Sequence, residues 1–183
     1  MLGGCSPDVG TGRSMRQLIL MRHAKAEPAA GQGDHGRALS RRGQAEALEA
    51  GRRIAALARP GAALVSDSAR TRQTLDCAAP ALPAGLPRRF TRALYGATAN
   101  AILAEVRETS PEVACLLVIG HNPGIGDLAR RLAADGEAEA LERVAAGFPT
   151  SCFAVVDLPA DSWKEAGPGR LAFLLPADER SGA

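Results

Sequence analysis

The chain has few cysteines, and no two of them stand at the spacing of a metal or redox motif. Cys5, Cys77, Cys115 and Cys152 are far apart, and there is no CxxC pair among them. A chain of 183 residues does not depend on disulfides for stability, so we expect reduced thiols. Cys115 and Cys152 lie in apolar runs, where a buried structural thiol is the usual finding and a catalytic thiolate is rare.

Long apolar runs are also missing. No segment approaches the roughly 20 apolar residues that a membrane-spanning helix needs, and residues 1–15 lack the basic region and apolar stretch of a secretion signal. We therefore expect a cytoplasmic protein without a membrane partner. Residues 1–15 are rich in Gly, Ser and Pro, which predicts a disordered extension or reflects an upstream start codon.

Charge of one sign is not in excess either. The 22 basic and 20 acidic residues leave a formal net charge of +2, which is too even a balance to predict binding to nucleic acid or to a membrane surface. Any attraction for anions must then be local. Length and 46% hydrophobic content suffice for one sizeable core, so we expect a single domain at 16–176 and a tail at 177–183. These quantities do not predict an oligomeric state.

Short apolar runs alternate with amphipathic segments. Continuous apolar runs predict buried strands at 17–21, 62–65 and 115–119. Alternating runs predict two further strands near the sheet edge, at 152–158 and 170–175. This order of elements favours an α/β fold, a three-layer α/β/α sandwich with a mostly parallel central sheet.

The helices are predicted between these strands. Ser40 is a suitable N-cap for a helix that ends near residue 58. Its expected apolar stripe consists of Ala45, Leu48, Ile54, Ala55 and Leu57. Further helices are predicted at 69–77, 99–108 and 125–132.

Residues suited to phosphate follow the first three predicted strands. Arg22 and His23 follow the first strand, Arg70 the second and His121 the third. In an open α/β sheet, ligands bind beyond the carboxyl ends of the strands, so these side chains are expected to converge. Solvation of the sheet rim is the alternative for any one of them, but it does not explain why the placement recurs at three strand ends.

Metal binding is the competing interpretation of the histidines, because imidazole is a common zinc ligand. His23, His35 and His121 are the only histidines, and no two of them have helical or zinc-finger spacing. Neither a cysteine pair nor a cluster of carboxylates supplements them. We therefore expect neither a metal nor another cofactor.

Several segments resemble one known family. Residues 20–24, which contain Arg22 and His23, resemble the Arg-His signature of the histidine phosphatase superfamily, whose fold is phosphoglycerate mutase-like. Four later segments are similar to the SixA-type phosphohistidine phosphatase branch of that superfamily, in the same order: 37–43, 65–74, 94–95 and 120–124. The similarity spans about residues 16–176.

The resemblance implies that His23 is the catalytic nucleophile and is phosphorylated during turnover, while Arg22, Arg70 and His121 surround the phosphoryl oxygens. Asn122 is a further candidate ligand of the phosphate and also shapes the turn after His121. The chemistry agrees with these roles, because a neutral imidazole can attack phosphorus and planar guanidinium groups match phosphate. No metal is required.

The group that protonates the leaving group is harder to assign. Larger relatives use a carboxylate near the region that here spans 91–95, where this chain has no acid. Asp34 is the first candidate and Glu27 the second, and either is equally compatible with being a surface carboxylate. Because a protonated imidazole leaves readily whereas an alkoxide needs stronger acid catalysis, the missing carboxylate favours phosphohistidine as the substrate.

We therefore expect a metal-independent phosphatase that acts on phosphohistidine in a signalling or phosphotransfer protein. A phosphatase for small phosphomonoesters and a non-catalytic phosphate-binding module are the alternatives. Arg37, Arg41, Arg42 and Arg72 either extend the positive field toward an acidic phosphoprotein or form an ordinary solvated surface.

Overall fold

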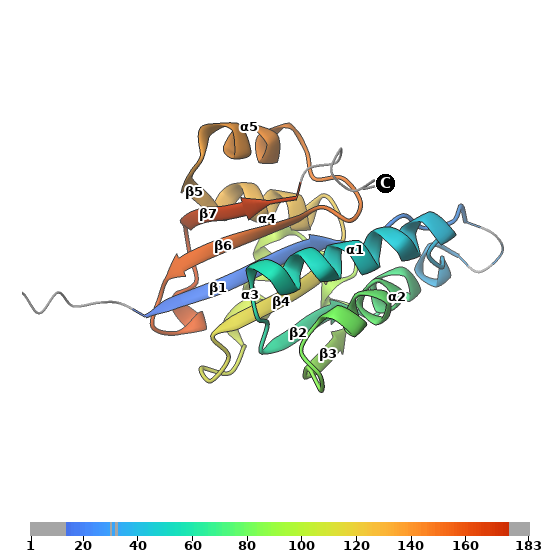
Figure 1. The fold of residues 1–183 in the computed structure, drawn as a ribbon, viewed down its shortest axis with the longest axis horizontal. Helices are drawn as coiled ribbons and strands as arrows, with labels where there is room; N and C mark the ends of the chain where they lie inside the picture. The colour runs from blue at the N-terminus through green and yellow to red at the C-terminus, as the bar shows by residue number, and fades with distance from the viewer. Residues whose placement is uncertain (1–13, 30, 32, 176–183) are drawn as a thin grey trace, which may run out of the picture.

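Seven strands form one sheet in the computed structural model, which describes residues 14–29, 31 and 33–175 (Figure 1). They are β1 (Met15–Arg22), β2 (Ala62–Ser66), β3 (Arg88–Thr91), β4 (Cys115–Gly120), β5 (Ala133–Gly136), β6 (Phe153–Pro159) and β7 (Gly169–Leu174). Their order across the sheet is β3-β2-β4-β1-β6-β7-β5. Of the extension predicted at 1–15, residues 1–13 lie outside the described residues, as does the tail predicted at 177–183, and Met15 is the first residue of β1.

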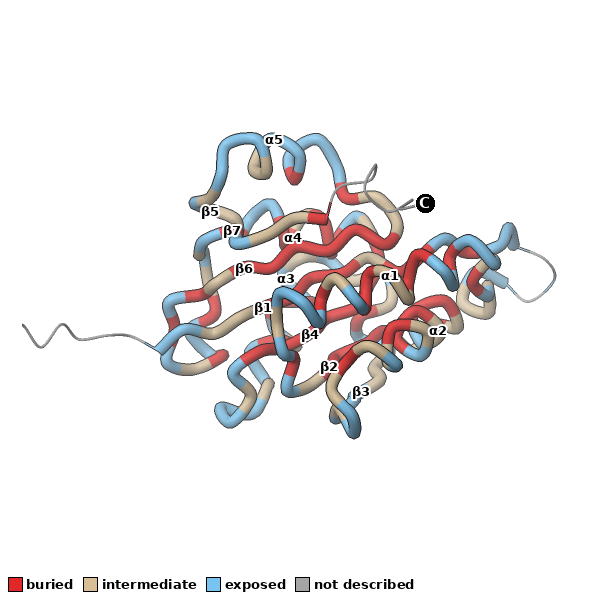
Figure 2. The backbone as a smooth tube through the Cα atoms, viewed as in Figure 1, coloured by how far each residue is buried: buried red, intermediate tan, exposed pale blue. Residues whose placement is uncertain are grey.

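Helices cover both faces of this sheet. The α-helices of the described segments are α1 (Arg41–Leu57), α2 (Ala69–Ala78), α3 (Ala99–Arg107), α4 (Gly124–Leu132) and α5 (Ala138–Ala146). α1 and α2 pack on the face that carries Ile19, and α3, α4 and α5 pack on the face that carries Leu18. Figure 2 shows that burial is concentrated in the central strands between these layers. The predicted three-layer sandwich is confirmed.

The sheet is mostly parallel, as predicted. β1 pairs in parallel with β4, β2 with β3 and β4, and β5 with β7. β6 is antiparallel to both β1 and β7. The prediction that β6 lies near the edge is wrong, because residues 153–156 are all buried and the strand has a partner on each side. β7 does lie next to an edge strand, β5.

The capping of α1 is as predicted, but its buried face is not. The Ser40 side chain accepts a hydrogen bond from the Gly43 amide at 3.0 Å. Of the predicted apolar stripe only Ile54 is buried. The buried face instead consists mainly of small residues, because α1 packs close to α2. Its buried members are Gly43, Glu46, Ala47, Ala50, Gly51 and Ile54.

Gly51 is a point where α1 packs closely on the last residue of α2, Ala78. A Cβ atom at this position would lie 2.7 Å from the carbonyl oxygen of Ala78. We expect Gly51→Ala to lower the free energy of unfolding by about 1–3 kcal/mol, because the added methyl must push two packed backbones apart. Gly61→Ala is the control, since its Cβ would meet nothing closer than 3.8 Å. Equal losses for the two variants in urea titrations would contradict this explanation.

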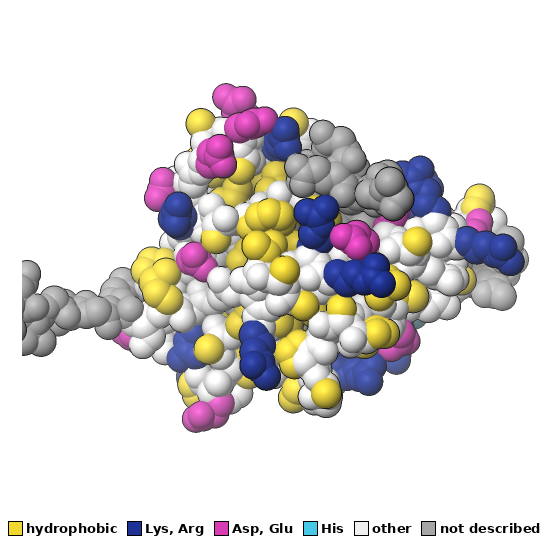
Figure 3. All heavy atoms as spheres, in the orientation of Figure 1, with side chains coloured by type: hydrophobic (Ala, Val, Ile, Leu, Met, Phe, Trp, Pro, Cys, Tyr) yellow, Lys and Arg dark blue, Asp and Glu magenta, His cyan; other side chains and the backbone are white. Residues whose placement is uncertain are grey.

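The surface carries charge of both signs. On the face drawn in Figure 3, which includes α1, basic and acidic side chains are interspersed rather than separated. This distribution matches the even count of 22 basic and 20 acidic residues. Across the described residues, no helix combines the length and the apolar character needed to span a membrane.

Candidate active site

Three neighbouring parallel strands end at the same edge of the sheet. Arg22 at the end of β1 lies opposite Gly120 of β4, and Val65 of β2 lies opposite Ile119 of β4. The residues that follow these strands therefore meet around one pocket of about 280 Å³. The pocket is lined by Arg22, His23, Lys25, Ala26, Arg37, Arg70, His121, Asn122 and Thr150. All four residues predicted from the strand ends are brought together here.

The His23 imidazole is buried and has a defined tautomer. Its Nδ1 lies 2.8 Å from the carbonyl oxygen of Ala24, and because a carbonyl only accepts, Nδ1 must carry the hydrogen. The Nε2 atom accepts a hydrogen bond from Arg70 Nε at 3.2 Å. Nε2 thus carries the lone pair of the ring, which accepts from Arg70 here and would reach an electrophile once that hydrogen bond is exchanged.

The backbone around His23 is held on three sides. Its amide donates to the Gly120 carbonyl at 3.1 Å, and its carbonyl accepts from the Ser151 amide at 3.2 Å. The next amide, that of Ala24, donates to Thr74 Oγ1 at 3.1 Å. These contacts come from three separate parts of the fold: from β4, from the segment that precedes β6, and from α2. Together they fix the backbone that carries the imidazole.

His121 has the opposite tautomer. Its Nδ1 lies 3.3 Å from Arg70 Nη2, which can only donate, so Nδ1 accepts. Its Nε2 therefore carries the hydrogen and donates to Ser66 Oγ at 2.9 Å. The ring centroids of His23 and His121 are 5.1 Å apart, and the Arg70 guanidinium contacts both rings.

α2 presents three polar side chains to the site at positions i, i+3 and i+4. Arg70 contacts both imidazoles, Gln73 Oε1 accepts from the Leu39 amide at 2.7 Å, and Thr74 holds the amide after His23. Side chains at this spacing share one helix face. α2 thus brings a guanidinium to both imidazoles and fixes the loop that precedes α1.

Asp34 lies at the site as an acceptor of hydrogen bonds. Its carboxylate accepts from the Tyr95 hydroxyl at 2.6 Å, from Arg37 Nη1 at 3.0 Å and from Arg70 Nη2 at 2.9 Å. These contacts, that of Tyr95 foremost, hold the pKa of Asp34 well below its usual range. A general acid needs the opposite shift, so the proton-donor role of Asp34 stays a prediction. Glu27 is exposed and does not line the pocket.

Asn122, a predicted phosphate ligand, lines the pocket but its amide already has a partner. Its Nδ2 donates to the carbonyl oxygen of Phe148 at 2.7 Å. The same carbonyl accepts from Arg22 Nη1 at 3.1 Å. Asn122 and Arg22 are therefore tied to one backbone group, and the role of Asn122 toward phosphate stays a prediction.

Sequence reasoning gave no role to Tyr95, although it is the only tyrosine of the chain. Its ring contacts His121 edge-on at 5.3 Å and His35 at 4.8 Å between centroids. Hydrogen bonding to Asp34 raises the pKa of the Tyr95 hydroxyl. His35 Nε2 in turn lies 2.8 Å from Asp67 Oδ1. Resemblance of segment 94–95 to the SixA branch was the one signal that pointed to this tyrosine.

The metal interpretation of the histidines finds no cluster in the described part of the chain. There, His, Cys, Asp and Glu side chains do not come together in a group of three or more that would hold an ion. His23 and His121 instead share Arg70, whose positive charge opposes a cation at the same place. Metal independence stays a prediction that a chelator experiment can test.

Burial keeps both imidazoles of the pocket neutral. The pKa of His23 falls from 6.5 to about 4, mainly through burial and also through the charges of Arg70 and Arg22, while the Ala24 contact opposes the shift. Burial likewise lowers the pKa of His121 to about 3. A neutral His23 is the form that can attack phosphorus, so the pocket maintains the reactive protonation state at neutral pH.

These shifts make stability depend on pH. Between pH 6.5 and about 4 the unfolded chain binds a proton at His23 that the folded protein excludes, so the free energy of unfolding should fall as the pH falls through this window. The shift from 6.5 to about 4 corresponds to about 3 kcal/mol, since one pKa unit is roughly 1.4 kcal/mol. Urea titrations at pH 7 and pH 4.5 should show a smaller loss in His23→Asn than in the parent protein. Equal losses would mean that His23 does not carry this dependence.

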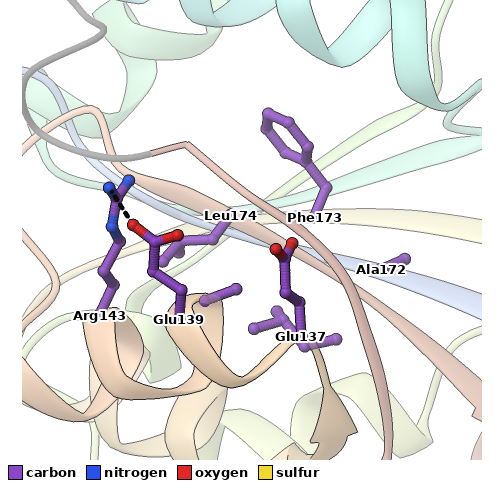
Figure 4. A pocket seen from close by; sticks show the side chains of 8 residues that line it. Glu137, Glu139, Arg143, Ala172, Phe173 and Leu174 are labelled. Carbon is purple, nitrogen blue, oxygen red and sulfur yellow. Dashed lines mark hydrogen bonds and ion pairs between the residues drawn. The ribbon is translucent and has the colours of Figure 1, made fainter.

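A second depression, of about 190 Å³, lies between α5 and β7 (Figure 4). Its polar lining includes Glu137, Glu139 and Arg143, and Arg143 Nη2 is already paired with Glu139 at 2.8 Å. Two carboxylates against one paired guanidinium disfavour an anion. The pocket at the strand ends is therefore the better candidate for phosphate.

Comparison with known proteins places the chain in a family. A model of the histidine phosphatase superfamily (branch 1) matches residues 18–114. An uncharacterized protein of Mycobacterium tuberculosis is 38% identical over 157 residues, covering 84% of this chain and 96% of the relative.

Solved structures agree with this assignment. SixA from Nakamurella multipartitia has a TM-score of 0.78 and 29% identity, covering 90% of this chain and 98% of its own. The protein histidine phosphatase SixA complexed with tungstate has a TM-score of 0.72 and 25% identity, covering 89% of this chain and 98% of its own. The predicted resemblance to the SixA branch is confirmed, and the chain belongs to the histidine phosphatase superfamily.

Proposed function

We propose that this protein is a metal-independent phosphatase that removes the phosphoryl group from phosphohistidine on a signalling or phosphotransfer protein, through transient phosphorylation of His23. The observation that carries the proposal is the orientation of His23. Its Nδ1 is tied to the Ala24 carbonyl, which leaves the Nε2 lone pair facing Arg70 in the pocket. This is the arrangement that a nucleophilic imidazole requires.

In the first step, His23 Nε2 attacks phosphorus. The bond between Nε2 and phosphorus forms while the bond between phosphorus and the substrate nitrogen breaks, and the departing imidazole takes a proton. Arg22 and Arg70 donate to the phosphoryl oxygens and stabilise the charge that spreads over them. His121 joins them in its protonated form, which a bound dianion favours because it raises the pKa of the imidazole. In the second step, water attacks phospho-His23, the nitrogen–phosphorus bond breaks, and inorganic phosphate is released.

Asp34 remains our candidate for moving the proton. In the ligand-free pocket its pKa is depressed, since Tyr95, Arg37 and Arg70 all donate to it. A phosphoryl group bound at Arg70 would take over that donor and bring negative charge beside the carboxylate. Both changes raise the pKa of Asp34 toward a value at which it can carry a proton.

Two features support a protein substrate. Lys25 and Arg37 line the same pocket as Arg22 and Arg70, so positive charge extends beyond the groups that a phosphoryl group alone would occupy. The second feature is the structural similarity to a protein histidine phosphatase solved with tungstate, an oxyanion. A cytoplasmic location, expected from the sequence, stays a prediction.

The test compares three reactions in the presence of a metal chelator. The purified protein is incubated with a phosphohistidine-bearing phosphotransfer protein, with a sugar phosphate and with an aryl phosphate. We expect kcat/KM to be at least about 10²-fold higher on the phosphoprotein, because its leaving imidazole needs little acid catalysis. Higher rates on the phosphomonoesters would favour the small-molecule alternative. Phosphate binding without turnover of any of the three would favour a binding module, and loss of activity with the chelator would refute metal independence.

A further inference from the structure

The segment between α5 and β6 organises the candidate active site through its backbone. The Phe148 carbonyl accepts hydrogen bonds from Arg22 Nη1 at 3.1 Å and from Asn122 Nδ2 at 2.7 Å. Three residues later, the Ser151 amide donates to the His23 carbonyl at 3.2 Å. Segment 148–151 is therefore hydrogen-bonded to two side chains that line the pocket and to the backbone of His23.

Ser151 holds this segment in an unfavourable backbone conformation. Its φ angle is 60°, and it is the single residue other than glycine with a positive φ in the described part of the chain. The residue is fully buried. Side chains rarely adopt this region, and such a conformation persists only where its surroundings enforce it. The Ser151 hydroxyl supplies one such constraint, because it donates to Glu46 Oε2 at 3.3 Å.

Glu46 is the buried acid of α1. It is 7% exposed, and its other oxygen, Oε1, accepts from Arg42 Nε at 2.7 Å. The Arg42 side chain is itself 74% exposed, so it compensates the buried carboxylate from the solvent side. Burial of a carboxylate is costly unless it is paired and hydrogen-bonded. Glu46 does not line the pocket, and its inward contact is with Ser151.

We propose that Glu46 is a positioning residue for the phosphoryl site, which acts through Ser151 on the backbone that orients Arg22 and His23. α1 is a rigid element anchored against α2 by the close approach at Gly51. A hydrogen bond from Ser151 to a carboxylate on this helix therefore holds segment 148–151 in a fixed position relative to α1. The expected effect on kcat rests on the proposed phosphatase activity. The expected effect on the affinity for an oxyanion does not, because it can be measured without turnover.

The first experiment replaces Glu46. We expect Glu46→Ala to lower kcat by about 10- to 100-fold, since small misplacements of reacting groups have effects of this size, and to raise the Kd for tungstate about tenfold through Arg22. Glu46→Gln keeps an oxygen that accepts from Ser151 and should stay within about threefold of the parent protein. Glu49→Ala is the matched control, because Glu49 lies on the same helix and pairs with Arg53 at 3.1 Å.

The second experiment replaces Ser151. It breaks the same hydrogen bond from the other side, so the proposal can still be tested if Glu46→Ala does not fold. Ser151→Gly removes the hydroxyl, yet glycine adopts a φ of 60° without strain, so this variant should fold. We expect the same losses as for Glu46→Ala, and no further loss in the double variant, because both act on one path. Thermal unfolding of every variant is measured alongside.

The outcomes separate the two proposals. Parent-like kcat and tungstate Kd in either Glu46→Ala or Ser151→Gly would overturn the positioning role, as would additive losses in the double variant or a Glu49→Ala loss of equal size. If the parent protein binds tungstate but turns over no substrate, the proposed function fails while the tungstate measurements still decide the role of Glu46. If the parent protein does not bind tungstate, both proposals fail.

Discussion

His23→Asn is expected to lower kcat on a phosphohistidine protein by about 10⁴-fold or more, the scale seen when a covalent nucleophile is removed. Asparagine keeps a polar side chain of moderate size at this position but has no imidazole lone pair to attack phosphorus. Arg22, Arg70 and His121 remain in place in this variant, so binding of tungstate should persist. A large loss of turnover with retained binding would separate the nucleophile from the groups that hold the oxyanion.

The same variant tests the covalent intermediate directly. After a brief reaction with radiolabelled phosphoprotein, the parent enzyme should carry label that is stable to alkali and labile to acid, as a phosphoimidazole is, and His23→Asn should carry none. His35→Asn is the matched control, because His35 is the one histidine of the three that does not line the pocket. Label retained on His23→Asn would place the nucleophile elsewhere.

Arg70→Lys is expected to lower kcat/KM by about 10²- to 10³-fold, the range for loss of one preorganised donor to a developing oxyanion. Arg70 uses Nε toward His23 and Nη2 toward His121 and Asp34, so it sets the orientation of both imidazoles while facing the pocket. Lysine keeps the charge but offers a single ammonium group without this planar fork. Affinity for tungstate should fall with the rate.

Arg72→Lys is the control for this substitution. Arg72 lies on the same helix, but its guanidinium sits over the Phe90 ring at 4.2 Å and its Nε donates to the Asp67 carbonyl at 2.9 Å. It does not line the pocket. Equal losses in Arg70→Lys and Arg72→Lys would indicate a general effect of charge or of α2 stability rather than a role at the oxyanion.

The strands that carry the site were predictable because they are continuous apolar runs buried on both faces. β1, β2 and β4 each have this character. β3 and β5 were missed since edge strands lack such a run, and neither contains a buried residue. α5 was missed as well, and of its residues only Val144 is buried. A hydrophobic pattern in the sequence reflects burial, so helices and strands that bury few residues are not predicted from it.

The site was predictable to the extent that its side chains follow strand ends. Arg22, His23, Arg70 and His121 were recognised by position and by residue type. The hydrogen bonds of the Phe148 carbonyl were not, since every residue carries a carbonyl and only the fold selects one. The buried face of α1 was mispredicted for a related reason, because the distance between two helices decides which residues fit between them.

The Asp34 carboxylate accepts a hydrogen bond from Arg70, the guanidinium that a phosphoryl group would need. An arriving phosphoryl dianion must therefore displace the Asp34 carboxylate from Arg70. When inorganic phosphate departs, Asp34 is still close by and pairs with Arg70 again. Exchange of one acceptor for another keeps the guanidinium satisfied throughout the cycle. We expect this competition to lower the affinity for free orthophosphate, so that the enzyme resists inhibition by its own product.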